Sequence, residues 1–136
     1  MIFDRNNEQE LKSVYIHDSI IKRFTFDYDN YSLALGLQNS YLRRHFYFDF
    51  VNVLYFDTIC TEPWGGGNSV QYIEKISQEE LQMIWTSRIK YMSGKSEQSL
   101  NEMKNRCLRI SFVVNSGNKI NIIAEKMSFE DTPIEE

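Results

Sequence analysis

Residues 20–38 read IIKRFTFDY, then DN, then YSLALGLQ, and their pattern is the strongest structural signal in the chain. In the first part, one face carries the large apolar side chains Ile20, Phe24, Phe26 and Tyr28. In the last part, small or polar residues alternate with Tyr31, Leu33, Leu35 and Leu37. A period of two predicts half-buried strands. Because Asp and Asn tolerate tight turns, 20–28 and 31–38 are predicted to form a β-hairpin around Asp29-Asn30.

Similar alternation predicts more strands along the chain, at 42–50, 51–60, 70–76, 108–115 and 120–125. Phe46, Phe48 and Phe50 share one face of the first of these. The pattern slips near 50–52, which indicates a bulge or a short turn. The last two strands flank Ser116-Gly117 and are expected to form a second hairpin.

One amphipathic helix is predicted at about 78–92. Ser77 can cap it, with Glu80 three residues later as in a capping box. Its apolar face carries Leu81, Ile84, Trp85, Ile89 and Met92. A further helical turn is expected at 100–104, and a loose lead-in or a short helix at 4–12. Residues from about 130 to 136 are rich in Asp and Glu, and we expect them to form a flexible acidic tail.

Hairpins dominate this order, and strands do not alternate with helices as they do in parallel sheets. We therefore expect one α+β domain over 1–136, with a strongly twisted antiparallel sheet and one main helix packed on it. A β-barrel or a two-sheet sandwich with one helix is the alternative.

Composition restricts the classes of partner. The chain has 136 residues, and its 15 Lys and Arg against 19 Asp and Glu give a net charge of −4. This balance argues against nucleic acid or an anionic membrane as the main partner. The first residues carry no signal-peptide pattern, and no apolar run reaches the length of a membrane span, so a cytoplasmic location is expected. Cys60 and Cys107 lie in apolar segments and are expected to be buried thiols.

Residues with chemically active side chains form no convincing catalytic or metal site. His17-Asp18-Ser19 has the letters of a hydrolytic triad, but consecutive residues on an extended chain point to alternating sides. A structural turn is the favoured interpretation, with His17 and Asp18 kept as a candidate polar site. The metal-ligand candidates His17, His45, Cys60 and Cys107 lack ligand spacing. We therefore expect no catalytic residues, metal or cofactor.

A Gly-rich stretch is the most informative polar segment. Pro63-Trp64-Gly65-Gly66 belongs to it, and no phosphate-binding Gly-Lys-Ser/Thr pattern follows. Trp64 has two interpretations: a lid folded on the core, or an exposed anchor for a partner. The second makes Trp64, Pro63, Gly65 and Gly66 a candidate partner-binding site.

Three short motifs carry a resemblance to a group of proteins. They are His17-Asp18-Ser19-x-Ile21, Phe50-x-Asn52-Val53 and Pro63-Trp64-Gly65, and together they cover roughly residues 15–65. This part of the chain resembles small uncharacterised bacterial domains, including immunity proteins that neutralise polymorphic toxins by direct binding. The resemblance implies a toxin domain as partner and supplies no catalytic residues.

The expected function is therefore a non-catalytic intracellular protein-binding domain of the immunity type. The alternative is a small-molecule-binding protein or enzyme that uses an aromatic-lined cavity in the curved sheet. A homo-oligomer with exposed Tyr and Phe packed between sheets is a third hypothesis.

Overall fold

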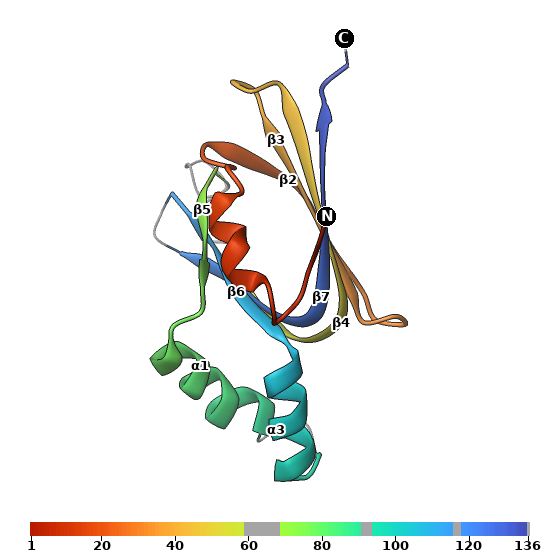
Figure 1. Ribbon diagram of the computed structural model, residues 1–136, viewed down its shortest axis with the longest axis vertical. Helices are drawn as coiled ribbons and strands as arrows, with labels where there is room; N and C mark the ends of the chain where they lie inside the picture. The colour runs from red at the N-terminus through yellow and green to blue at the C-terminus, as the bar shows by residue number, and fades with distance from the viewer. Residues whose placement is uncertain (59–68, 91–93, 116–117, 136) are drawn as a thin grey trace.

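The computed structural model describes residues 1–58, 69–90, 94–115 and 118–135 (Figure 1). Its elements follow the order β1 (Ile2–Phe3), η1 (Glu8–Ser13), β2 (Ser19–Asp27), β3 (Ser32–Asn39), β4 (Arg44–Asp57), β5 (Ser69–Lys75), α1 (Gln78–Ile84), η2 (Trp85–Ile89), α3 (Glu97–Arg106), β6 (Leu108–Val114) and β7 (Lys119–Pro133). Here η1 is a 3₁₀-helix, and η2 is a π-helical turn that continues α1.

The strands form one antiparallel sheet that closes into a six-stranded barrel. Neighbouring strands follow the order β7-β4-β3-β2-β5-β6, and β6 pairs again with β7 to complete the ring. The short strand β1 adds to β7 outside this ring. The predicted antiparallel sheet and both predicted hairpins are confirmed. The closed barrel given as the alternative describes the sheet better than an open sheet does.

Two long strands make the closure possible. In β4, the first half pairs with β3, and nearly the whole strand pairs with β7. Figure 1 shows β4 and β7 bending together around the lower part of the barrel. The slip expected near 50–52 is confirmed, because Asn52 has a positive φ of 52° and the β4–β7 register shifts between Val53 and Tyr55.

The inside of the barrel is packed with side chains. Phe48, Phe50 and Phe112 are fully buried there, as the alternation predicted for the strands requires. Phe48 contacts Phe112 edge-to-face, with ring centroids 5.1 Å apart. Phe3, Leu11 and Ile16, from the N-terminal segment, complete the same cluster. Side chains of the described residues thus fill the middle of the barrel.

The helices pack on the outside of the barrel and form a second apolar cluster. It joins Ile76, Leu81, Ile84, Trp85, Ile89, Leu100, Cys107 and Ile123. The Ser77 cap is confirmed, since Ser77 Oγ accepts from the Glu80 amide at 3.2 Å. The Glu80 carboxylate instead accepts from Asn121 Nδ2 at 3.1 Å, so it holds the helix against β7. Met92 lies outside the described residues, and α3 is longer than the predicted helical turn.

The C-terminal residues correct one prediction. Instead of forming a flexible acidic tail, residues 130–133 extend β7 and pair with β4. The charges are compatible with a strand because Asp131 forms an ion pair with Arg44 Nε at 2.5 Å. Phe129, immediately before them, stacks against Phe46. In the described parts of the chain, no helix is both long and apolar enough to cross a membrane.

Candidate functional site

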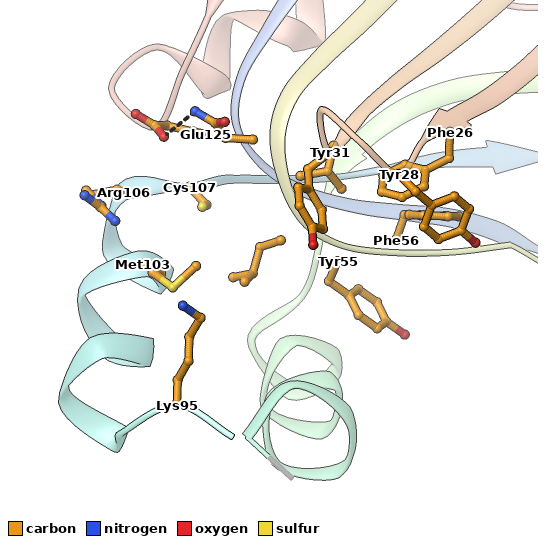
Figure 2. A pocket seen from close by; sticks show the side chains of 13 residues that line it. Phe26, Tyr28, Tyr31, Tyr55, Phe56, Lys95, Met103, Arg106, Cys107 and Glu125 are labelled. Atoms are coloured by element: carbon orange, nitrogen blue, oxygen red, sulfur yellow. Dashed lines mark hydrogen bonds between the residues drawn. The ribbon is translucent and has the colours of Figure 1, made fainter. Parts of the chain in front are cut away.

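A cavity on the barrel exterior is an open groove of about 720 Å³ between the β2–β3 hairpin tip and α3. Its volume falls in the range of small-ligand sites, which is roughly 300–1,000 Å³. Figure 2 shows the hairpin and α3 on opposite sides of this space. The groove is lined by Phe26, Tyr28, Tyr31, Asn52, Val53, Leu54, Tyr55, Phe56, Lys95, Met103, Arg106, Cys107 and Glu125.

Two irregular backbone positions build the groove. Tyr31 at the end of the hairpin turn and Asn52 in β4 both have positive φ, 50° and 52°. The carbonyl of Tyr31 accepts a hydrogen bond from the Val53 amide at 2.9 Å, which ties the hairpin tip to β4. Asn52 Nδ2 donates to Glu125 Oε2 at 3.0 Å. These two bonds hold the hairpin tip, β4 and β7 together at the mouth of the groove.

Aromatic rings form the hairpin side of the groove. The Phe26 ring lies 4.8 Å from Phe56 and 4.8 Å from Tyr28, the latter edge-to-face. Tyr31 lies 6.5 Å from Phe26 in a similar orientation. Phe26 and Phe56 are half-buried, whereas Tyr28 and Tyr31 are 77% and 60% exposed. Two anchored rings thus support two exposed rings that can contact a ligand.

Cationic and sulfur-bearing side chains form the α3 side. Met103, Arg106 and Cys107 come from α3 and its C-terminal end, and Lys95 precedes the helix. In Figure 2 the Lys95 ammonium points toward Met103 and the middle of the groove. Arg106 is exposed, and none of the ion pairs among the described residues includes it. The lining thus carries two cations and one carboxylate, Glu125, in a chain whose net charge is −4.

Two weakly acidic groups in the lining, Cys107 and Tyr55, stay protonated at neutral pH. Burial is the main cause that raises the pKa of the Cys107 thiol to about 11, with a smaller contribution from Glu125. Burial likewise raises the pKa of the Tyr55 phenol, and its hydroxyl donates to Asp57 Oδ2 at 2.5 Å. A protonated thiol is a poor nucleophile. These groups therefore suit packing and hydrogen bonding better than covalent chemistry.

Of the predicted site residues that the structure describes, neither His17 nor Asp18 lines this groove. Trp64, Pro63, Gly65 and Gly66 lie outside the described residues, as does Cys60. His17 and Asp18 lie at the opposite end of β2 from the hairpin tip, where Asp18 has a positive φ of 65°. His17 Nδ1 lies 3.2 Å from the Gln71 carbonyl, and its Nε2 lies 3.4 Å from Asp18 Oδ2. This geometry agrees with the favoured interpretation of a structural turn.

Ser19, the third residue of that motif, is fully buried. Its hydroxyl accepts a hydrogen bond from Asn39 Nδ2 at 3.1 Å, and the same amide donates to the His17 carbonyl at 2.9 Å. The Asn39 side chain therefore links the end of β3 to the start of β2. Among the described residues, no three His, Cys, Asp or Glu side chains gather as a metal site would require.

Sequence reasoning missed most of the groove. It recognised that Tyr and Phe could line a pocket and that β4 slips near Asn52. It could not place α3 beside the hairpin tip, because Met103 and Arg106 are more than 70 residues from Tyr28 and Tyr31. The one usable signal was the pair of tyrosines that flank Asp29-Asn30, since a turn normally carries smaller polar residues there.

Comparisons with known proteins give a likeness in structure alone. No protein-family model matches the chain, and no curated protein matches it significantly. A crystal structure of an uncharacterized protein from Neisseria gonorrhoeae is similar, with a TM-score of 0.48 and 16% sequence identity. The match covers 84% of this chain and 91% of that one. The description of that protein states no ligand, partner or activity.

Proposed function

We propose that this chain is a non-catalytic binding protein whose groove takes a small organic acid with a flat apolar body. The observation that carries the proposal is the groove itself, where aromatic rings face a wall that holds two cations. Ligand sites are typically concave and mostly apolar, with a few polar groups that orient the ligand.

The charges favour an acid over a base. Glu125 is already engaged by the Asn52 amide, whereas Arg106 forms no ion pair with a carboxylate in the described parts of the chain. The guanidinium group can bind a carboxylate through two parallel hydrogen bonds. Tyr28 and Tyr31 offer ring faces and edges to a flat ligand.

Binding without catalysis is supported by the state of the lining groups. The Cys107 thiol is buried and has a raised pKa, and the Tyr55 hydroxyl is committed to Asp57. Neither group therefore serves as an activated nucleophile at neutral pH.

Calorimetry with three probes of similar shape tests this proposal: indole-3-propionate, the neutral 3-methylindole and the cationic tryptamine. We expect affinity to fall in that order. Arg106→Gln should weaken indole-3-propionate by about tenfold, since a hydrogen bond to a charged group contributes roughly 1.5 kcal/mol or more. It should leave 3-methylindole unchanged. Lys126→Gln, which removes an exposed positive charge outside the groove, is the matched control.

A second pair of variants tests the aromatic wall. Tyr28→Ala should weaken all three probes, whereas Tyr72→Ala, at an exposed tyrosine outside the groove, should not. Binding of none of the probes would contradict a small aromatic ligand. Equal binding of all three would contradict selection for an acid while leaving an apolar site in place.

Neutralisation of a toxin by direct binding is the second candidate function. It is favoured by the hairpin tip, where Tyr28 and Tyr31 are strongly exposed, because Tyr is enriched among the residues that dominate protein interfaces. Co-expression with a toxin domain encoded beside the gene tests it. If the tip is the contact, Tyr28→Ala with Tyr31→Ala should weaken the purified complex by at least 30-fold, whereas Arg106→Gln should have little effect.

A further inference from the structure

In the part of the chain that the structure describes, one edge of β2 has no strand beside it over most of its length. On one side, β2 pairs with β3 from Ile20 to Asp27. On the other side it pairs with β5 only at Ser19 and Ile20. Figure 1 shows β2 crossing away from β5 toward the hairpin tip at the lower right. In the described parts of the chain, no backbone hydrogen bond is made to this edge beyond Ile20.

Natural proteins commonly protect such edges, because unpaired N–H and C=O groups can recruit another strand. Here the protection covers only the beginning of the edge. The β2–β3 register shifts between Ile21 and Arg23, and Lys22 in the shift is exposed. Residues 23–27 follow as a regular five-residue strand with neither Pro nor Lys.

The sequence of this five-residue edge, RFTFD, is complementary to itself in the antiparallel direction. With Thr25 opposite Thr25 of a second copy, Arg23 lies opposite Asp27, and Phe24 lies opposite Phe26. Side chains directly opposite in an antiparallel pair share a face and contact each other. This register therefore gives two ion pairs and two aromatic pairs, and a shift by one residue removes all four.

The side chains are available for this pairing. Arg23, Thr25 and Asp27 are exposed. Arg23 Nε donates a long hydrogen bond to Thr25 Oγ1 at 3.4 Å. Phe24 and Phe26 are half-buried against Phe56, so each ring keeps part of its surface exposed. Asp27 accepts hydrogen bonds from the Asp29 amide and from Asn30 Nδ2, and these bonds lower its pKa. Its carboxylate is thus ionised and held in place at neutral pH.

We propose that two copies of this chain form a symmetric dimer by pairing residues 23–27 of their β2 strands antiparallel about a two-fold axis at Thr25. The contact is self-complementary and closed, so it stops at two chains. It does not depend on the ligand proposed for the groove.

Sedimentation velocity between about 1 and 200 μM tests the dimer, and the expected mass is twice the 16.2 kDa of one chain. Arg23→Asp places two carboxylates opposite each other, and Asp27→Lys places two cations opposite each other. Each variant alone should associate at least tenfold more weakly than the wild type. Mixed in equal amounts, the two variants should form a heterodimer, because each new charge then faces an opposite one.

Thr25→Lys provides an independent test, since it brings two Lys side chains together at the axis and should also give monomers. Thr86→Lys, the same change at an exposed helical position, should leave the dimer intact. Hydrogen exchange should show protection of residues 23–27 that increases with concentration. A wild type that is monomeric at 200 μM would overturn the proposal. A dimer unaffected by Thr25→Lys, or variants that fail to pair on mixing, would also overturn it, and a peptide from another protein would then become the alternative occupant of this edge.

Discussion

Replacing Phe48 by Ala tests whether the barrel interior is as solid as the structure shows. The Phe48 side chain is fully buried in β4 and belongs to the barrel cluster. Its ring lies 5.1 Å from Phe112, edge-to-face, and 4.9 Å from Phe129. The substitution therefore removes two aromatic contacts and leaves a cavity that the surrounding strands, paired on both sides, can fill only in part.

The expected cost follows from these contacts. Truncation of a buried Phe to Ala typically costs about 3–5 kcal/mol, and the two ring pairs place this site in the upper half of that range. Because a domain is stable by only about 5–15 kcal/mol, about 4 kcal/mol is a large part of the free energy of unfolding. With a urea m value of about 2 kcal/mol/M, the midpoint should fall by about 2 M.

Urea unfolding of Phe48→Ala beside Tyr47→Ala measures this effect. Tyr47 is the next residue of the same strand but faces outward, 39% exposed, where its ring lies over Gly36. We expect the Tyr47 variant to lose about 1 kcal/mol or less. If the two variants lost similar free energies, the barrel would have a loose or hollow interior, and the distinction between a filled barrel and an outer groove would be refuted.

Substitutions at three further positions, Glu8, Cys107 and Asn52, test buried and irregular features of the fold. Glu8 is buried, and its carboxylate accepts a hydrogen bond from the backbone amide of Arg109 at 3.1 Å. In urea unfolding, Glu8→Ala should cost about 3 kcal/mol, and Glu8→Gln clearly less, because the Gln side chain keeps an acceptor oxygen. Equal losses of the two variants would contradict this role. Folding raises the pKa of Cys107 from its ordinary value of 9.0 to about 11, so the folded state holds the proton more tightly and the free energy of unfolding should fall between pH 9 and 11. Cys107→Ala should reduce that fall, and an unchanged pH profile would show that the thiol does not cause it. Asn52→Ala should be less stable than Asn52→Gly by about 1 kcal/mol, because Gly adopts a positive φ without strain. Thermal unfolding measures this difference. A more stable Ala variant would exclude backbone strain at this position.

Local patterns predicted the individual strands well. The hairpin expected at 20–28 and 31–38 is found at Ser19–Asp27 and Ser32–Asn39. One face of each strand packs in the same core, so the alternation of apolar residues indicates directly which residues form strands. The cap at Ser77 was also readable, because the capping hydrogen bond joins residues only three positions apart.

Closure of the barrel could not be read in this way. It depends on β7 pairing with the distant strand β4 and on a short contact of Ser19 and Ile20 with β5. A strand with a buried face has the same sequence pattern in an open sheet and in a barrel. The prediction of a flexible acidic tail failed for a related reason, since the partner of Asp131 is Arg44, 87 residues away in the sequence.

The groove depends on the positions where the local pattern breaks. Among the described residues, positive φ outside glycine occurs at Asp18, Tyr31, Arg43 and Asn52. Two of these, Tyr31 and Asn52, line the groove and are joined through the bond from the Val53 amide to the Tyr31 carbonyl.

The irregularity at Asn52 changes which way β4 faces its neighbours. Before it, Phe46, Phe48 and Phe50 point into the barrel. After it, Leu54 and Tyr55 pack with the helices outside. A β4 without this slip would continue its alternation and could not turn two successive side chains toward α1 and α3. Irregular backbone held in place by specific hydrogen bonds is typical of binding sites, and here it supplies the surface on which the aromatic and cationic walls meet.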